Sequence, residues 1–216
     1  MRFRIILAAL CFVILSSANA QKANYKVGLI GFYNVENLYD TIDDPIKNDA
    51  EYLPSGSKRY NSYVYLDKIG NLSKVLSMIG TDVSPDGLSI IGLAEVENDT
   101  VLHDLVSHPL MQSRNYQIVH HNSPDIRGVD VAMLYIPKYF TVISSEPLFV
   151  PLFEADGSKR FTRDILFVHG KYDGEDLYVM VCHWPSRRGG EEISAPGRAM
   201  AASICRNKID SLTKIN

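Results

Sequence analysis

The chain has 216 residues, of which 46% are hydrophobic, and its 22 basic and 25 acidic residues give a formal net charge of −3. This length suits one domain with a substantial core and is too short to support two. The acidic balance excludes general nucleic-acid binding by bulk charge.

The first residues have the pattern of a secretory signal peptide. Arg2 and Arg4 precede an apolar run too short to span a bilayer, and a small-x-small cleavage pattern ends at Ala20. We predict a signal peptide over residues 1–20, a mature domain over 21–216, and a secreted or periplasmic protein without stable membrane insertion. A retained membrane anchor is the alternative. Loss of the two arginines changes the net charge from −3 to −5, so bound phosphate requires a local basic cluster or a metal.

The first half of the mature chain alternates strands and helices. A run rich in β-formers predicts a buried strand over residues 27–33, and a second apolar strand is expected over 89–93. Between them, apolar residues that share one face predict an amphipathic helix over 66–79. Another helix is expected to begin after Asn98 or Asp99, because either side chain can cap it.

The second half consists mainly of strands. They are predicted over residues 116–121, 129–135, 139–144, 164–172 and 177–182. Asp173-Gly174 marks a hairpin turn between the last two, and Ser194 is expected to cap a closing helix. This order predicts an α+β fold whose sheets carry helices on their outer faces. Mixed pairing is expected, because hairpins force antiparallel neighbours while the early helix allows a parallel pair.

Oxygen-bearing side chains follow the first two predicted strands. The stretch GFYNVENLYD contributes Asn34, Glu36, Asn37 and Asp40. Such side chains bind hard cations or hold a substrate, although a turn and helix cap explains them equally simply. In IIGLAEVEN, Glu95 and Glu97 follow the apolar strand, and one carboxylate is expected to face a site while the other faces away. A carboxylate after a buried strand is costly to leave unpaired, and a metal relieves that cost.

Two later stretches supply candidate substrate contacts. In RGVDVAMLY, Arg127 and Asp130 either bind substrate or form a structural ion pair. In CHWPSRRGG, His183 ends an apolar strand and precedes Arg187 and Arg188 in a glycine-containing loop. An imidazole can shuttle a proton or hydrogen-bond phosphate oxygens, and guanidinium groups clamp them in fork geometry. A solvated turn is the alternative for the arginines.

Other histidines and the cysteines leave their roles open. His120 and His121 come near a site only if their strand ends there. Cys182 and Cys205 either form a disulfide bridge or remain buried thiols.

Asn34, Glu95 and His183 each follow an apolar strand, and the strands of one packed sheet system can bring their ends to one rim. An oxygen-ligand metal site beside an imidazole and arginines suits phosphoryl-ester hydrolysis. The order Asn-x-x-Asn, Leu-x-Glu and His-x-x-Ser resembles the endonuclease/exonuclease/phosphatase superfamily, which includes pancreatic-type deoxyribonucleases, abasic-site endonucleases, sphingomyelinases and inositol-polyphosphate phosphatases. The resemblance covers essentially all of residues 21–216.

The resemblance implies a four-layer α/β sandwich, in which two mixed sheets pack face to face with helices outside. It places Asn34 and Glu95 at the metal-site positions, with Glu95 as the direct ligand of Mg²⁺, or of Mn²⁺ or Ca²⁺ in its place. His183 takes the position of the histidine that contacts the scissile phosphate. The family pattern continues with Gly-Asp-Phe-Asn and Ser-Asp-His stretches that do not occur here. We therefore expect these residues to be the first part of a longer protein, with little or no hydrolytic activity alone.

These observations predict an exported, Mg²⁺-dependent phosphoesterase that acts on a phosphodiester or phosphomonoester. Its expected substrate is a nucleic acid, a phospholipid head group or a sugar phosphate, and a monomer is expected. The alternative is a non-catalytic binding module on the same fold that recognises an anionic ligand.

Overall fold

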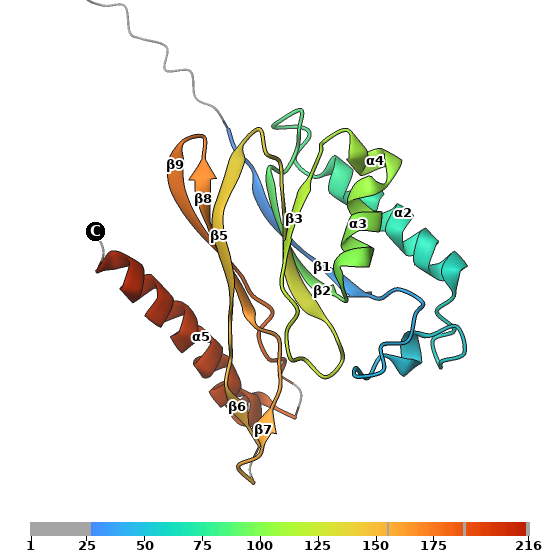
Figure 1. The fold of residues 1–216 in the computed structure, drawn as a ribbon, viewed down its shortest axis with the longest axis vertical. Coiled ribbons are helices and arrows are strands. Elements are labelled where there is room, and N and C mark those ends of the chain that lie inside the picture. The colour runs from blue at the N-terminus through green and yellow to red at the C-terminus, as the bar shows by residue number, and fades with distance from the viewer. Residues whose placement is uncertain (1–26, 155, 188, 215–216) are drawn as a thin grey trace, which may run out of the picture.

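A computed structural model of the chain describes residues 27–154, 156–187 and 189–214. The predicted signal peptide and Arg188 therefore lie outside the described residues. Seen edge-on, the elements form four layers: helix, sheet, sheet and helices (Figure 1). Helix α5 (Glu191–Thr213) covers one sheet, and helices α2 (Ser62–Met78) and α3 (Asp99–Ser107) cover the other.

The sheet beneath α2 contains four strands in the order β1-β2-β4-β3. Their bounds are Ile30–Leu38 for β1, Ile90–Val96 for β2, Gln117–His120 for β3 and Asp130–Tyr135 for β4. β1 and β2 are parallel, whereas β4 is antiparallel to both of its neighbours. A parallel pair needs a crossover connection, and α2 lies in that connection.

The sheet beneath α5 contains three strands in the order β5-β8-β9, and both of its pairings are antiparallel. Their bounds are Phe140–Leu148 for β5, Ile165–Tyr172 for β8 and Glu175–Val181 for β9. The β8–β9 turn lies at Asp173 and Gly174, as predicted, with φ values of 52° and 97°. These left-handed values are those that a tight hairpin turn requires.

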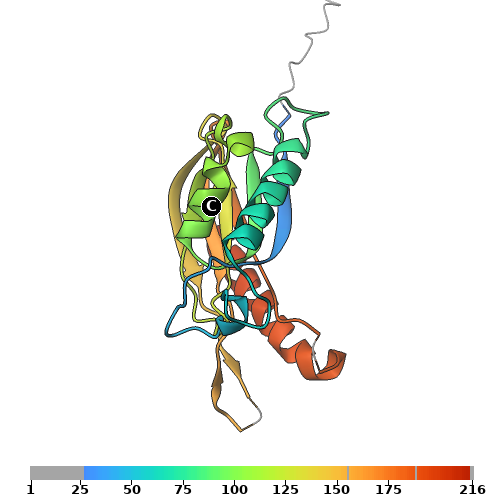
Figure 2. The ribbon, with the colours of Figure 1, turned by 90° about the vertical axis from the view of Figure 1, so that its right-hand side faces the viewer.

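A short hairpin of β6 (Leu152–Phe153) and β7 (Lys159–Arg160) was not predicted, because two residues are too few to show an alternating pattern. It projects from the end of the sandwich where α5 begins (Figures 1 and 2). Between the sheets, the buried core includes Ile90, Met133, Phe140, Val168 and Val181. Burial of this apolar area from water is the main force that holds the two sheets together.

The helices on the other side pack through the apolar face that the sequence predicts. Ile69, Leu72 and Leu76 of α2 are buried against the sheet. α2 begins at Ser62, four residues before the predicted start, because Asn61 caps it by accepting bonds from the Tyr63 and Val64 amides. Two short helical segments, η1 (Ala50–Tyr52) and α4 (Pro109–Gln112), complete this side.

The caps of the other helices were predicted with mixed success. Asn98 caps α3, as predicted, by accepting a bond from the Val101 amide. The prediction that Ser194 caps the closing helix is wrong, because α5 begins at Glu191 after Gly190. The Ser194 hydroxyl instead donates to the Gly190 carbonyl at 2.6 Å. Acidic residues in the first turn are favourable beside the positive end of the helix dipole.

The predicted α+β fold of two packed sheets with outer helices is confirmed. Mixed pairing occurs in the sheet under α2, while the described strands of the other sheet are antiparallel. Within the described part of the chain, no helix combines the length and apolar character that crossing a bilayer would require.

Candidate active site

The candidate site is built on irregular backbone where β1 and β2 lie side by side. Asn34 pairs with Ala94, and beyond this point the register of both strands shifts. Glu95 lies in the irregularity of β2, between Ala94, which pairs with Val131, and Val96, which pairs with Asp130. Its φ of 67° is left-handed. Such bulges redirect a side chain, and they are common beside active sites.

The bulge places the Glu95 carboxylate against His183, the second residue after β9. Glu95 Oε1 lies 3.4 Å from His183 Nε2, and their side chains are 15% and 20% exposed. Glu97, in contrast, accepts a bond from the Asp40 amide at 2.6 Å, and burial raises its pKa to about 7. The two carboxylates therefore contact different parts of the protein, Glu95 lying against His183 and Glu97 against the Asp40 backbone.

His183 is neutral in this environment. Burial, followed by the positive charge of Arg163, lowers the pKa of His183 to about 4, and the opposing effect of Glu95 is smaller. Its Nδ1 is buried without a hydrogen-bond partner among the described residues. Buried polar atoms are generally hydrogen-bonded, so Nδ1 remains available as a hydrogen-bonding group.

Two arginines gather around one buried carboxylate beside His183. Asp125 Oδ2 lies 3.1 Å from Arg163 Nη1, and Asp125 Oδ1 lies 3.7 Å from Arg127 Nε. The Arg127 side chain is 47% exposed. The backbone carbonyl of Arg127 accepts a hydrogen bond from the Tyr39 hydroxyl at 2.7 Å. The loop at 125–127 therefore presents an accessible guanidinium that is anchored through its backbone.

The sequence pattern missed Arg163 and Asp125. Arg163 precedes a strand in FTRDIL, and Asp125 lies two residues before Arg127. Neither position shows a spacing that indicates a site. Only the packing of β8 beside β9 brings Arg163 close to His183.

Asp130 was predicted to bind substrate or to form a structural ion pair, and the structure shows it in contact with other side chains of the protein. Its side chain is buried, one oxygen accepts bonds from the Ser123 amide and hydroxyl, and the other lies 3.3 Å from His120 Nε2. Both carboxylate oxygens are therefore occupied by the protein. These contacts favour the structural alternative, with His120 and Ser123 as partners in place of Arg127. His121 bonds to the Ser145 hydroxyl.

The arginines after His183 are less closely tied to the site. Arg187 is exposed, and its carbonyl accepts a bond from the Gly190 amide at 3.0 Å. Gly189 and Gly190 have φ values of 84° and 106°, which a residue with a side chain rarely adopts. The two glycines thus turn the chain into α5.

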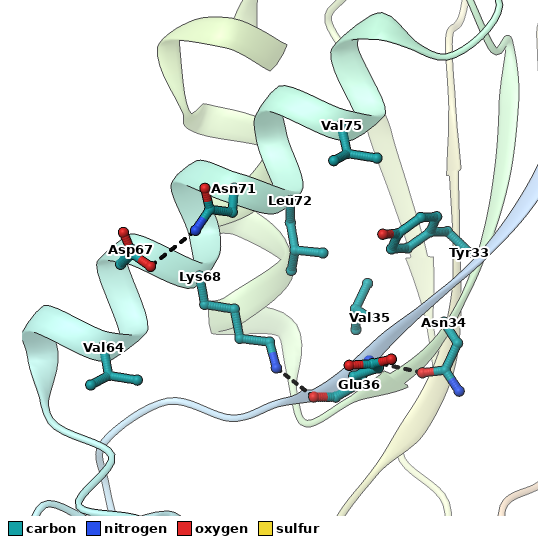
Figure 3. Close-up of a pocket in the computed structure, with 10 residues that line it drawn as sticks. All are labelled: Tyr33, Asn34, Val35, Glu36, Val64, Asp67, Lys68, Asn71, Leu72 and Val75. Atoms are coloured by element: carbon teal, nitrogen blue, oxygen red, sulfur yellow. Dashed lines mark hydrogen bonds between the residues drawn. The ribbon is translucent and has the colours of Figure 1, made fainter.

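The end of β1 is held by α2 (Figure 3). Asn34 Oδ1 accepts a bond from the Glu36 amide at 2.8 Å. Lys68 of α2 donates to the carbonyl oxygens of Glu36 and Asn37, whose φ values of 55° and 61° are also left-handed. Burial lowers the pKa of Lys68. A cavity of about 380 Å³ between β1 and α2 opens beside these residues.

The oxygen donors present are few, and their chemistry suits a hard divalent cation. Within residues 27–154, 156–187 and 189–214, no group of three or more His, Cys, Asp or Glu side chains gathers in a metal-binding arrangement. Mg²⁺ retains several waters and is bound by one or two carboxylates together with substrate phosphates. The carboxylate of Glu95, with the amide oxygen of Asn34 on the adjacent strand, is a donor set of that kind.

Several solved structures are similar to this chain. The endonuclease/exonuclease/phosphatase from Bacteroides vulgatus has a TM-score of 0.50 and 14% identity, over 85% of this chain and 59% of that one. TDP2 from Caenorhabditis elegans has a TM-score of 0.48 and 19% identity, over 70% and 39%. The human Nocturnin catalytic domain has a TM-score of 0.45 and 16% identity, over 67% and 52%. The chain thus spans between 39% and 59% of these structures.

A search of curated protein sequences found no significant match. The model of the endonuclease/exonuclease/phosphatase family matches residues 29–216, nearly the whole chain. The Bacteroides vulgatus structure shows the same fold. The chain therefore belongs to the endonuclease/exonuclease/phosphatase family.

Proposed function

We propose that this chain supplies part of the active site of an exported, Mg²⁺-dependent phosphoesterase that hydrolyses a phosphodiester or phosphomonoester. The observation that carries the proposal is the placement of Glu95, on a bulge, within 3.4 Å of His183 and beside a cluster of arginines. Because the chain spans 39–59% of similar structures, the activity and substrate of the whole protein are part of this proposal.

Each residue has a distinct role in this proposal. Glu95 and Asn34 would hold the metal, which polarises the phosphoryl oxygen and lowers the pKa of water when it is bound. The neutral His183 can hydrogen-bond a phosphate oxygen or accept a proton through a ring nitrogen. Arg127 lies where its exposed guanidinium can pair with a phosphate oxygen. Asp125 positions Arg127 and Arg163 without contacting substrate.

The test is hydrolysis of double-stranded DNA, bis-p-nitrophenyl phosphate and sphingomyelin by the protein purified from its host, with Mg²⁺ and with EDTA. Turnover that EDTA abolishes would support the proposal and identify the substrate class. A Glu95→Gln variant should lose on the order of 100-fold or more in kcat, because a metal ligand contributes several kcal/mol. Glu97→Gln is the matched control and should retain activity. Turnover that is insensitive to EDTA or to Glu95→Gln would refute the assignment.

If the protein hydrolyses none of these substrates but still binds anions, the result would favour the alternative of a non-catalytic binding module.

A further inference from the structure

A second basic cavity adjoins the candidate site. Its volume is about 270 Å³, and it lies between the β6–β7 hairpin and the first turn of α5. Arg160, Arg163 and Asp125 line it from one side, Ser194 lines it from the helix, and Pro185 belongs to the segment that follows His183. The cavity and the hydrolytic site therefore share the segment after β9 and the loop that carries Arg163.

Arg163 connects the two sites. Its side chain is only 10% exposed, and Nη1 bonds to Asp125. Its Nε is buried and has no hydrogen-bond partner among the described residues, although the residue lines the cavity. An unpaired guanidinium N–H is costly to bury, and an anion oxygen is the partner that it favours. The observation that points to a ligand is the position of this guanidinium group in the wall of the cavity, next to the partly exposed side chain of Arg160.

Arg160 is available to the same ligand. Its nearest carboxylate oxygen is that of Glu154, at 3.9 Å from Nε, and both side chains are partly exposed. Such a pair is weak and is screened by salt. Arg160 Nη2 lies 3.1 Å from the position that a Cβ on Gly197 would occupy, so the guanidinium rests on α5 where the helix has no side chain.

A third guanidinium lies beside the cavity. Arg198 Nη1 donates to the Ser194 hydroxyl oxygen at 2.7 Å. Apolar surface adjoins these charges, because Phe161 and Ile193 line the cavity and Trp184 precedes Pro185. Phe161 and Trp184 are 43% and 40% exposed. Guanidinium groups beside exposed aromatic rings can bind nucleotides, because the charges pair with the phosphates and the bases stack on the rings.

We propose that this cavity is an anion subsite, in which Arg160 and Arg163 bind a second phosphate of the substrate next to the ester that the Glu95–His183 site hydrolyses. The statement that this phosphate belongs to the substrate rests on the proposed function. Binding of a phosphate to the cavity requires neither a metal nor turnover. The second phosphate comes either from the next nucleotide of a single strand or from a small molecule with two phosphates.

Binding is measured by isothermal titration calorimetry, which requires no reporter group at the cavity. The full chain is titrated in EDTA with thymidine 5′-monophosphate, thymidine 3′,5′-bisphosphate and a short oligothymidylate. We expect the ligands with two or more phosphates to bind about tenfold or more tightly than the monophosphate. If the oligothymidylate binds more tightly than the bisphosphate, the source is a strand, and equal affinities indicate a small molecule.

Arg160→Gln should remove most of this preference, and Arg206→Gln should leave it unchanged. Arg206 is a matched control because it is exposed on α5 and pairs only with Asp210 among the partners found in the described chain. Arg163 is not substituted, because its loss would leave Asp125 buried without its closest cation. Equal affinity for one and two phosphates, or a preference that survives Arg160→Gln, would overturn the subsite.

Glu95→Gln separates the two proposals. It should abolish metal-dependent hydrolysis and keep the preference for two phosphates, because Glu95 does not line the cavity. A protein that hydrolyses nothing but retains an Arg160-dependent preference would refute the hydrolase and leave the subsite standing.

Discussion

Glu95 Oε1 lies 3.4 Å from His183 Nε2, although Glu95 belongs to β2 in one sheet and His183 follows β9 of the other sheet. Glu95 reaches this position only because its backbone is left-handed, with a φ of 67°. A non-glycine residue with a left-handed backbone is higher in free energy, and such strained residues are often found at functional sites. The left-handed backbone of Glu95 therefore explains both the local strain and the contact between Glu95 and His183.

Glu95→Gly should stabilise the protein while removing its metal ligand. Glycine adopts a left-handed backbone freely, so the free energy of unfolding should rise by about 1 kcal/mol. Urea denaturation measures this change. Glu97→Gly is the control and should be less stable than the wild type, because Glu97 φ is not left-handed and its carboxylate bonds to the Asp40 amide. A Glu95→Gly variant that unfolds at a lower urea concentration would show that the bulge is not strained.

Asp125→Asn should destabilise the fold strongly. Asp125 is buried, and its carboxylate faces Arg163, which is itself nine-tenths buried. Removing one partner of a buried ion pair leaves an uncompensated charge and costs about 3 kcal/mol or more. Asp176→Asn is the matched control, because Asp176 is half-exposed and pairs with His169 and Lys171. This variant should unfold at nearly the same urea concentration as the wild type in the same experiment. Equal losses in the two variants would contradict the role of Asp125.

His120 should make stability depend on pH. Its side chain is 2% exposed, with Nδ1 at 2.9 Å from Asp99 and Nε2 at 3.3 Å from Asp130. Burial acts to lower the pKa of His120, but its bonds and charge interactions with the two carboxylates outweigh burial and raise it. Because the pKa is higher in the folded state, the stabilisation is complete below the unfolded pKa of about 6.5. It is lost as the pH rises through the folded pKa.

The stability difference between the wild type and His120→Gln should accordingly be largest in acid and shrink at alkaline pH. Urea denaturation at about pH 6 and about pH 9 measures it on either side of the unfolded value. His103→Gln, at an exposed position on α3, should show no such trend. A difference that grows with pH would mean that His120 is buried in its neutral form.

Cys182 and Cys205 should form a disulfide on oxidation. Both are free thiols, and their sulfur atoms lie 3.9 Å apart between the end of β9 and α5. Burial, reinforced by Cys205, raises the pKa of Cys182 to about 12, so thiolate is scarce and air oxidation should be slow. Diamide would take up the two thiol hydrogens as the sulfur–sulfur bond forms.

Oxidation should raise the free energy of unfolding by about 3 kcal/mol, because the bridge closes a loop in the unfolded chain. Mass spectrometry of the diamide-treated protein should show the loss of two hydrogens, and Cys205→Ser should abolish both effects. Two thiols that still react with a thiol reagent after diamide treatment would show that the backbone holds them apart.

The sequence by itself determined most of the elements and the residues at the strand ends. Alternating and amphipathic patterns located the main strands, the buried face of α2 and the Asn98 cap, because these depend on local spacing. Asn34, Glu95 and His183 could be singled out because polar side chains directly follow apolar runs. Local patterns fail where the element is too short, as in β6 and β7, or where two candidate caps compete, as at Gly190 and Ser194.

Only the tertiary structure decided which of these residues meet. A bulge turns Glu95 toward His183 and leaves Glu97 elsewhere, and a bulge depends on the register between strands, which no single segment encodes. Asp130 has the same appearance in sequence as a substrate ligand, but burial beside His120 gives it a structural role. Arg163 and Arg160 have no distinguishing pattern, and they become candidates because the packing of β7, β8 and α5 encloses them around one cavity. Charge and burial are properties of the assembled sheets, so they appear only once distant strands pack together.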